Sequence, residues 1–305
     1  MAVELGYRRG YRLYLANGLA WHITANEAAR PWVEKLAAIL ELKICDRNGY
    51  PNLIFLRREK VKESGEQWIR CLDAKIQGDL PWTGWKVRKL PAVRIWSHPE
   101  VLDVIFEIGH GEDCELDILR MLLAFYPIFE RAQDSGGLPF HAAVVERQGI
   151  GILLAASGNT GKSTCCSRLP SPWQPLCDDK ALVVRDEKKQ YQVHPLPTWS
   201  NYFMKRSEQT WNVQSHVPLA AIFFLEQAEI DNVVPMGRGQ AAVLIAQSAM
   251  QVYDPNWSNV DRAEVRDFRI KLFDNGCDLA RVIPAFKLQV SLNGRFWEKI
   301  EKVLP

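Results

Sequence analysis

Short stretches of alternating apolar and polar residues, together with one longer stretch of helical spacing, make up the first hundred residues. The alternation predicts strands at residues 11–15 and 53–56. Between them, apolar residues at helical spacing predict a helix over residues 31–40. Thr24 and Glu27 have the spacing of a capping box and would mark the start of this helix. The pattern is typical of a small α+β unit.

A second helical pattern separates this unit from the rest of the chain. Apolar residues recur every three to four positions from residue 113 to residue 131, and Pro127 predicts a kink. A Gly-rich break follows at residues 134–137. We therefore expect an N-terminal α+β domain at residues 1–112, a connector helix at 113–134 and a second domain at 135–305.

The second domain mixes strands and helices. Two apolar runs at residues 141–145 and 150–155 have the spacing of a hairpin. Strict alternation over residues 286–292 predicts a half-buried strand, and residues 295–303 predict a closing helix. Together the elements predict an α/β (α+β) fold class.

Composition is that of a globular protein and excludes several classes of function. Of the 305 residues, 38 are Lys or Arg and 36 are Asp or Glu, so the net charge of +2 gives no basic field for nucleic acid. No apolar run approaches the roughly 18 residues that span a bilayer, and the start of the chain does not resemble a secretory signal. The seven cysteines contain no Cys-x-x-Cys pair, which argues against disulfides and structural zinc. We expect a cytoplasmic protein that binds neither membranes nor nucleic acid.

Residues 156–163 (ASGNTGKS) match a phosphate-binding loop, except that Ala156 stands where the first glycine is usual. Gly158 and Gly161 let the backbone turn its N–H groups inward, and the following helix start adds a positive dipole end. Lys162 would reach the β and γ phosphates of ATP, and Ser163 would bind Mg²⁺. The alternative is a surface loop that binds no nucleotide. The expected nucleotide-binding residues are Ala156, Ser157, Gly158, Asn159, Thr160, Gly161, Lys162, Ser163 and Thr164.

Asp178 and Asp179 follow the loop lysine by only sixteen and seventeen residues. The helix after Lys162 must end near Leu169 because Pro170 follows, and the next eight residues are long enough to bring the chain back to the phosphates. One carboxylate of such a pair can hold Mg²⁺ while the other accepts the proton of an attacking hydroxyl. Alone, an Asp-Asp pair is more often a solvated turn.

Four further features are candidates for the site or for a partner surface. His141 opens a strand and would touch a phosphate or orient an aspartate, although a structural role is equally consistent. The Pro-rich residues 194–200 would line a pocket or simply pack. Arg238 lies between two glycines on an expected loop and would stabilise transferring charge. Trp82 and Trp85 flank a turn of the N-terminal domain, where packing competes with a role in partner binding.

At His141, the loop and Asp178-Asp179, the sequence resembles the HPr serine kinase/phosphorylase family, whose P-loop core is related to phosphoenolpyruvate carboxykinase. The resemblance implies that His141 and the loop bind phosphate, that Asp178 acts as acid and base, and that Asp179 assists the metal. Over its whole length, the chain resembles more closely the kinase-like C protein of the SynChlorMet cassette, which is associated with radical-SAM peptide-modification genes. Thr164 replaces an acidic residue of the bifunctional enzymes, which argues against phosphorylase activity.

The sequence thus predicts a phosphotransferase that uses ATP and Mg²⁺ to phosphorylate a hydroxyl, with serine expected, on a peptide or small protein. Asp178, Lys162 and His141 would be catalytic, and Ser163 and Asp179 would bind the metal. A radical-SAM enzyme of the same cassette is a candidate partner, and the N-terminal domain would recognise a peptide or partner. Two alternatives stay open: a noncatalytic nucleotide-binding adaptor, and a carboxykinase-like or small-metabolite kinase.

Overall fold

The computed structural model describes residues 9–46, 49–57, 81, 83–90, 92–109, 114–156, 160–203, 208–253 and 261–304. Within them, seven strands form a first sheet in the order β3-β1-β2-β4-β7-β6-β5. The pairs β2–β4 and β4–β7 are parallel, and the other pairs are antiparallel. The strands are β1 (Arg9–Tyr14), β2 (Ala20–Ala25), β3 (Lys43–Asp46), β4 (Asn52–Arg57), β5 (Lys86–Leu90), β6 (Val93–Ser97) and β7 (Val104–Ile108).

Helix α1 (Arg30–Ile39) covers this sheet, preceded by the short 3-10 helix η1 (Glu27–Ala29). The predicted helix is confirmed, but its capping residue is not Thr24. The side chain of Asn26 accepts the backbone N–H of Ala29 instead, because η1 already begins at Glu27. The apolar face of α1 packs Trp32 against the rings of Phe55 and Phe106.

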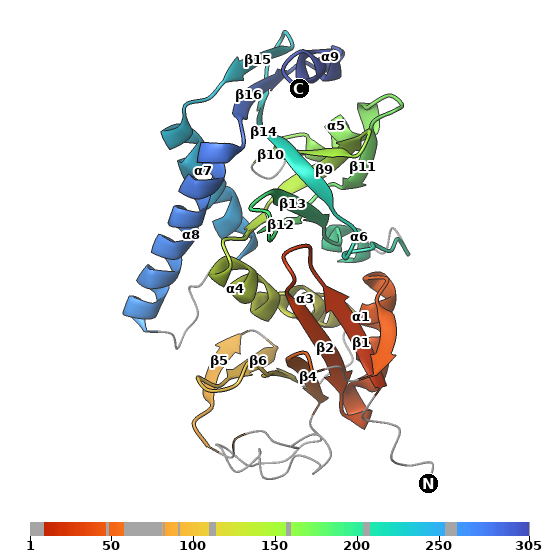
Figure 1. The fold of residues 1–305 in the computed structure, drawn as a ribbon. Coiled ribbons are helices and arrows are strands. Elements are labelled where there is room, and N and C mark those ends of the chain that lie inside the picture. The colour runs from red at the N-terminus through yellow and green to blue at the C-terminus, as the bar shows by residue number, and fades with distance from the viewer. Residues whose placement is uncertain are drawn as a thin grey trace.

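Two helices, α3 (Cys114–Leu123) and α4 (Tyr126–Asp134), lie between the two sheets (Figure 1). The sequence predicted a single kinked helix here, and the structure has two separate helices instead. Pro127 sits in the first turn of α4, where its missing N–H leaves no helical hydrogen bond unmade. One apolar cluster runs from the first sheet through these helices into the second sheet.

The second sheet has nine strands within the described residues, with β11-β9-β10-β14-β13-β12-β8 as its main path; β16 also pairs with β14, and β15 pairs with β16. Strand β14 is parallel to both β10 and β16. The strands are β8 (Leu138–Phe140), β9 (Ala142–Arg147), β10 (Ile150–Ala155), β11 (Gln174–Cys177), β12 (Ala181–Arg185), β13 (Tyr191–Pro195), β14 (Val217–Gln227), β15 (Asn232–Pro235) and β16 (Ala285–Val290). The hairpin predicted from the sequence is confirmed as β9–β10.

Helices cover both faces of this sheet because side chains along β10 alternate between them. Leu154 packs in the cluster that contains α5 (Lys162–Arg168) and α9 (Phe296–Glu301), whereas Leu153 packs in the cluster that contains α7 (Arg238–Val252) and α8 (Arg262–Val282). A further short helix, α6 (Trp199–Phe203), follows β13. Two mixed sheets with helices give the α+β class predicted from the sequence.

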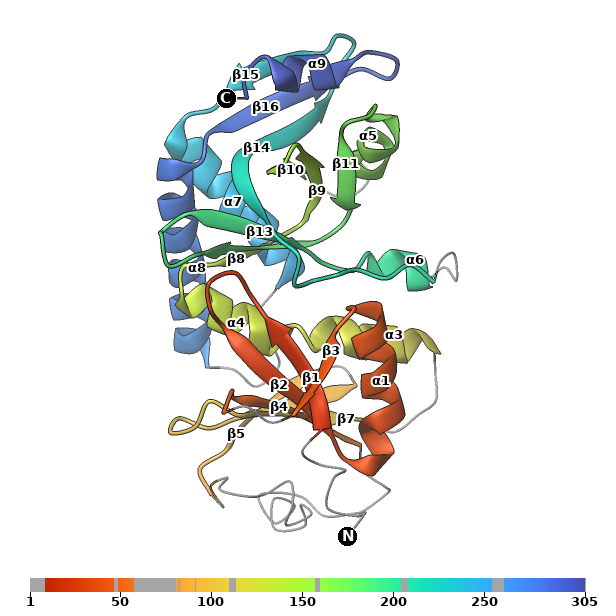
Figure 2. The same ribbon diagram turned by 45° about the vertical axis from the view of Figure 1, so that its right-hand side comes forward.

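The two sheets contact one another directly as well as through α3 and α4 (Figure 2). In the turn between β1 and β2, Ala16 donates its backbone N–H to His194 Nε2 of β13 at 3.1 Å. Arg88 of β5 forms an ion pair with Glu130 of α4. Trp85, one of the two tryptophans flanking the predicted turn, is buried, and Trp82 lies outside the described residues. None of the helices in the described part of the chain is both long enough and apolar enough to span a bilayer.

Candidate functional site

The loop between β10 and α5 contains the predicted phosphate-binding residues. Ala156 follows the buried strand directly, and α5 begins at Lys162. Gly161 has φ of +105°, a conformation that residues with a Cβ rarely adopt. Of the nine predicted nucleotide-binding residues, Ser157, Gly158 and Asn159 lie outside the described residues.

Lys162 points back along this loop. Its side chain is buried, and Nζ donates to the carbonyl oxygen of Ala156 at 3.0 Å. Burial lowers the pKa of Lys162, and the nearby carboxylate of Asp179 opposes that effect. The ammonium group is thus held at the start of the loop, close to the aspartate pair.

His141 and Asp179 lie on two segments of the second sheet where the chain changes its partner strand. Strand β8 pairs with β12, whereas β9 pairs with β11, so the chain changes partners at His141. The segment between Cys177 and Ala181 makes the matching change, because β11 before it pairs with β9 and β12 after it pairs with β8. The two segments lie side by side, and His141 Nε2 lies 3.2 Å from Asp179 Oδ1.

Asp179 uses both carboxylate oxygens in contacts with other side chains. Oδ1 faces His141, and Oδ2 accepts from Lys180 Nζ at 2.7 Å. Burial acts to raise the pKa of Asp179, but the hydrogen bonds from His141 and Lys180 and their positive charge lower it to about 2. Asp179 is therefore a fixed anion at the centre of a basic group of residues.

Asp178 is held by a different element. Thr198 Oγ1 donates to Asp178 Oδ1, and Thr198 itself is buried. The same segment is tied to the aspartate loop by a backbone bond from Leu196 N to Lys180 O at 3.0 Å. The Pro-rich residues 194–200 thus lie against the aspartate pair. Thr198 was not singled out from the sequence, because a lone threonine carries no pattern.

Helix α7 supplies residues to the site that the sequence analysis missed. Ser248 Oγ accepts the backbone N–H of His141 at 3.0 Å, and Gln251 contacts His141 Nδ1 through its side-chain oxygen. The sequence did contain one indication of this role, a polar stripe formed by Gln240, Gln247 and Gln251 on one face of an otherwise Ala-rich helix.

A protein-family model matches the part of the chain that contains these residues. The family model of the SynChlorMet cassette protein ScmC matches residues 104–305, about two thirds of the chain. The chain belongs to the ScmC family. The match begins in β7 and includes His141, Lys162 and the aspartate pair. A search of curated proteins returned no match.

Oxygen ligands suited to Mg²⁺ are available in this ScmC family member. Ser163 is exposed on the first turn of α5, and Asp178 accepts one hydrogen bond from Thr198. Among the described residues, no group of three or more His, Cys, Asp or Glu side chains is arranged to hold a metal ion. Hydroxyl and carboxylate oxygens are the kind of ligand that Mg²⁺ prefers, so Ser163 and Asp178 would suit as two of its ligands.

Arg238 does not lie on a loop, as the sequence analysis expected. It is the first residue of α7 and is exposed. Ser248 is ten positions further along the helix, which corresponds to about 15 Å. The flanking glycines Gly237 and Gly239 suggested a loop, but Gly237 serves as the N-cap and Gly239 is helical.

Proposed function

We propose that this protein is an ATP-dependent phosphotransferase, similar to HPr kinase, that phosphorylates a hydroxyl group on a peptide or small protein. The observation that carries the proposal is the grouping of four side chains at the loop after β10. The buried Lys162 ammonium lies with Asp178, Asp179 and His141, residues that come from three separate places in the sequence. Burial of unlike charges together is common at sites that process charged ligands.

Each residue has a role in the proposed reaction. Lys162 and the loop backbone would hold the β and γ phosphates of ATP. Bound Mg²⁺, with Ser163 and an aspartate among its ligands, would neutralise charge on those phosphates. The acceptor oxygen attacks the γ phosphorus, the bond to the bridging oxygen of ADP breaks, and the hydroxyl proton passes to the carboxylate of Asp178. Asp179 and His141 would hold this arrangement in place and assist the metal.

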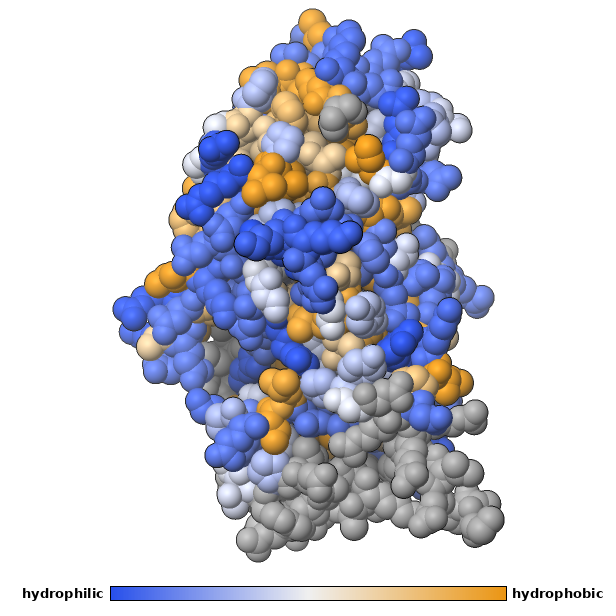
Figure 3. Space-filling view, viewed as in Figure 1, coloured by the Kyte–Doolittle hydropathy of each residue, from blue (hydrophilic) through white to orange (hydrophobic). Residues whose placement is uncertain are grey.

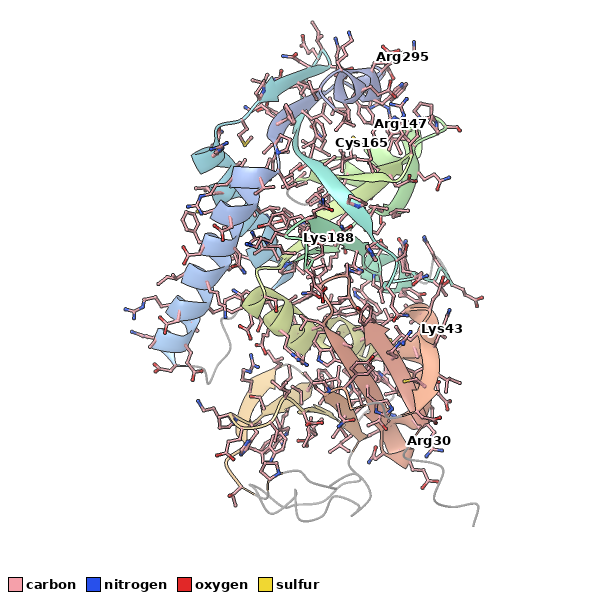
Figure 4. All side chains as sticks on the ribbon, in the orientation of Figure 1. Arg30, Lys43, Arg147, Cys165, Lys188 and Arg295 are labelled. Atoms are coloured by element: carbon pink, nitrogen blue, oxygen red, sulfur yellow. The ribbon has the colours of Figure 1, made fainter. Side chains whose placement is uncertain are left out.

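Transfer of labelled γ-phosphate to cassette peptides tests the proposal. Asp178→Asn should lower kcat by about 10² to 10⁴ if Asp178 is the general base. Lys162→Ala should also weaken MgATP binding, because it removes the phosphate-binding cation. The control is Lys188→Ala, since Lys188 lies exposed in the turn between β12 and β13 (Figure 4). Transfer that is unchanged in both site variants would refute the proposal.

A noncatalytic nucleotide-binding adaptor is the second candidate. The engagement of both Asp179 oxygens by His141 and Lys180 supports it, because these contacts leave fewer lone pairs for a metal ion than a carboxylate without partners has. An adaptor would bind MgATP without turnover, and Asp178→Asn would leave its partner binding unchanged. In either case, the expected partners are a peptide or small protein and a radical-SAM enzyme of the cassette.

A further inference from the structure

A cavity of about 420 Å³ opens where α7 passes over the ends of β10 and β14. Its floor includes Ala155, Phe224 and Lys287, which stand opposite one another across the parallel strands β10, β14 and β16. Its wall is the polar stripe of α7, including Gln247 and Gln251. The volume lies within the range of sites for small ligands.

The position of the cavity relates it to the phosphate end of the nucleotide. Ala156 lines the cavity, and its carbonyl oxygen accepts from Lys162 Nζ. The lysine of such a loop reaches the β and γ phosphates. At the same end, Gln251 contacts His141, which is paired with Asp179. A group in the cavity would therefore lie beside the γ phosphate and the proposed base.

The lining has the chemistry of a site for an uncharged ligand. Its charged side chains are Glu226 and Lys287, which pair with each other at 3.4 Å. The other lining residues are apolar, or carry amides and a hydroxyl. Glutamine side chains both donate and accept hydrogen bonds, as peptide groups do. In the view of Figure 3, apolar residues also gather in the upper part of the molecule, over the region of this sheet.

We infer that this cavity binds the phosphoryl acceptor, and that the acceptor is a hydroxyl-bearing residue of a peptide with uncharged neighbours. The inference rests on the proposed kinase function and specifies its substrate. The acceptor hydroxyl gives its proton to Asp178 and receives the γ-phosphoryl group, and ADP leaves. The Gln side chains of α7 would hold the flanking peptide groups.

Two capped peptides, acetyl-Ala-Ser-Ala-amide and acetyl-Asp-Ser-Asp-amide, probe the acceptor, and MgATP binding is measured separately. Wild-type protein should transfer phosphate to the neutral peptide with a kcat/KM at least about ten-fold higher than to the charged one. Leu244→Trp, which fills the cavity, should lower transfer to the neutral peptide by about ten-fold or more with little change in MgATP affinity. The matched control is Val243→Trp, because Val243 is the adjacent residue and is 44% exposed.

Gln247→Trp provides a second variant at an exposed position, so loss of folding cannot explain both results. Equal transfer by Leu244→Trp, Gln247→Trp and wild type would overturn the inference. So would weaker MgATP binding with unchanged transfer from bound ATP, since the cavity would then hold the nucleoside. Preference for the charged peptide, or ATP hydrolysis without transfer to either peptide, would overturn the stated acceptor chemistry. Absence of MgATP binding in wild type would instead refute the proposed function itself, and this inference with it.

Discussion

Replacement of Asp179 by asparagine removes the charge at the centre of the site. Contacts with His141 and Lys180 lower the pKa of Asp179 from its ordinary value of 3.8 to about 2. Each tenfold change in proton affinity corresponds to about 1.4 kcal/mol, so the ionised carboxylate contributes about 2 kcal/mol to stability. Its side chain is 20% exposed, so solvent screening reduces this value only modestly. Because the folded-state pKa is the lower one, the contribution is complete above pH 3.8 and is lost as the pH falls towards 2.

Urea unfolding of wild type and Asp179→Asn, measured from neutral pH down to the folded-state pKa of about 2, tests the effect. At neutral pH the variant should be less stable by about 2 kcal/mol, and the difference should shrink as acid protonates the wild-type carboxylate. Asp134→Asn is the control, since Asp134 forms an exposed ion pair with Lys271, and such pairs are worth about 0 to 1 kcal/mol. A loss equal to that of the control, or one that does not depend on pH, would refute the assigned contacts.

Two further predictions concern the loop and the contact between the sheets. Gly161→Ala should destabilise the protein by about 1 to 3 kcal/mol and weaken MgATP binding, because Gly161 has positive φ, whereas Gly239→Ala should stabilise it slightly because Gly239 is in a helix. Equal effects of Gly161→Ala and Gly239→Ala on unfolding and on nucleotide titrations would contradict the role given to the positive φ of Gly161. Burial lowers the pKa of His194 from 6.5 to about 4, so wild type should lose up to about 3 kcal/mol as the pH falls through that range. His194→Gln can keep both hydrogen bonds but cannot take up a proton. The difference in free energy of unfolding between wild type and this variant should therefore be smaller at about pH 5 than at about pH 7. Parallel pH profiles of the two proteins would exclude a buried neutral imidazole.

The parts of the fold that could be predicted from the sequence are those in which pattern and structure are local. The hairpin of β9 and β10 and the short helix α5 follow directly from apolar runs bounded by turn residues and by Pro170. The spacing between Lys162 and Asp179 also predicted their proximity, because eight residues are enough for the chain to return. Local patterns worked less well for helix ends, where Asn26 replaced Thr24 as the cap.

The parts that could not be predicted depend on contacts between distant segments. No periodicity in the sequence says that α7 lies against His141, or that Thr198 reaches Asp178. The tie between Ala16 and His194 joins segments that are 178 residues apart. These contacts depend on the order of strands in the second sheet and on how the first sheet packs against it, which hydrophobic patterning does not specify.

The structure holds the two aspartates by different contacts, whereas the sequence assigned them different roles only through the resemblance to HPr kinase. Asp179 is held by two basic side chains, so it is a poor proton acceptor and its oxygens are already engaged. Asp178 accepts a hydrogen bond from the neutral hydroxyl of Thr198, a contact that orients the carboxylate without adding a positive charge. The Lys162 ammonium lies near both carboxylates, so the two aspartates differ in their contacts with His141, Lys180 and Thr198. In the proposed reaction, this difference supports Asp178 as the base and Asp179 as the residue that holds the site together and assists the metal.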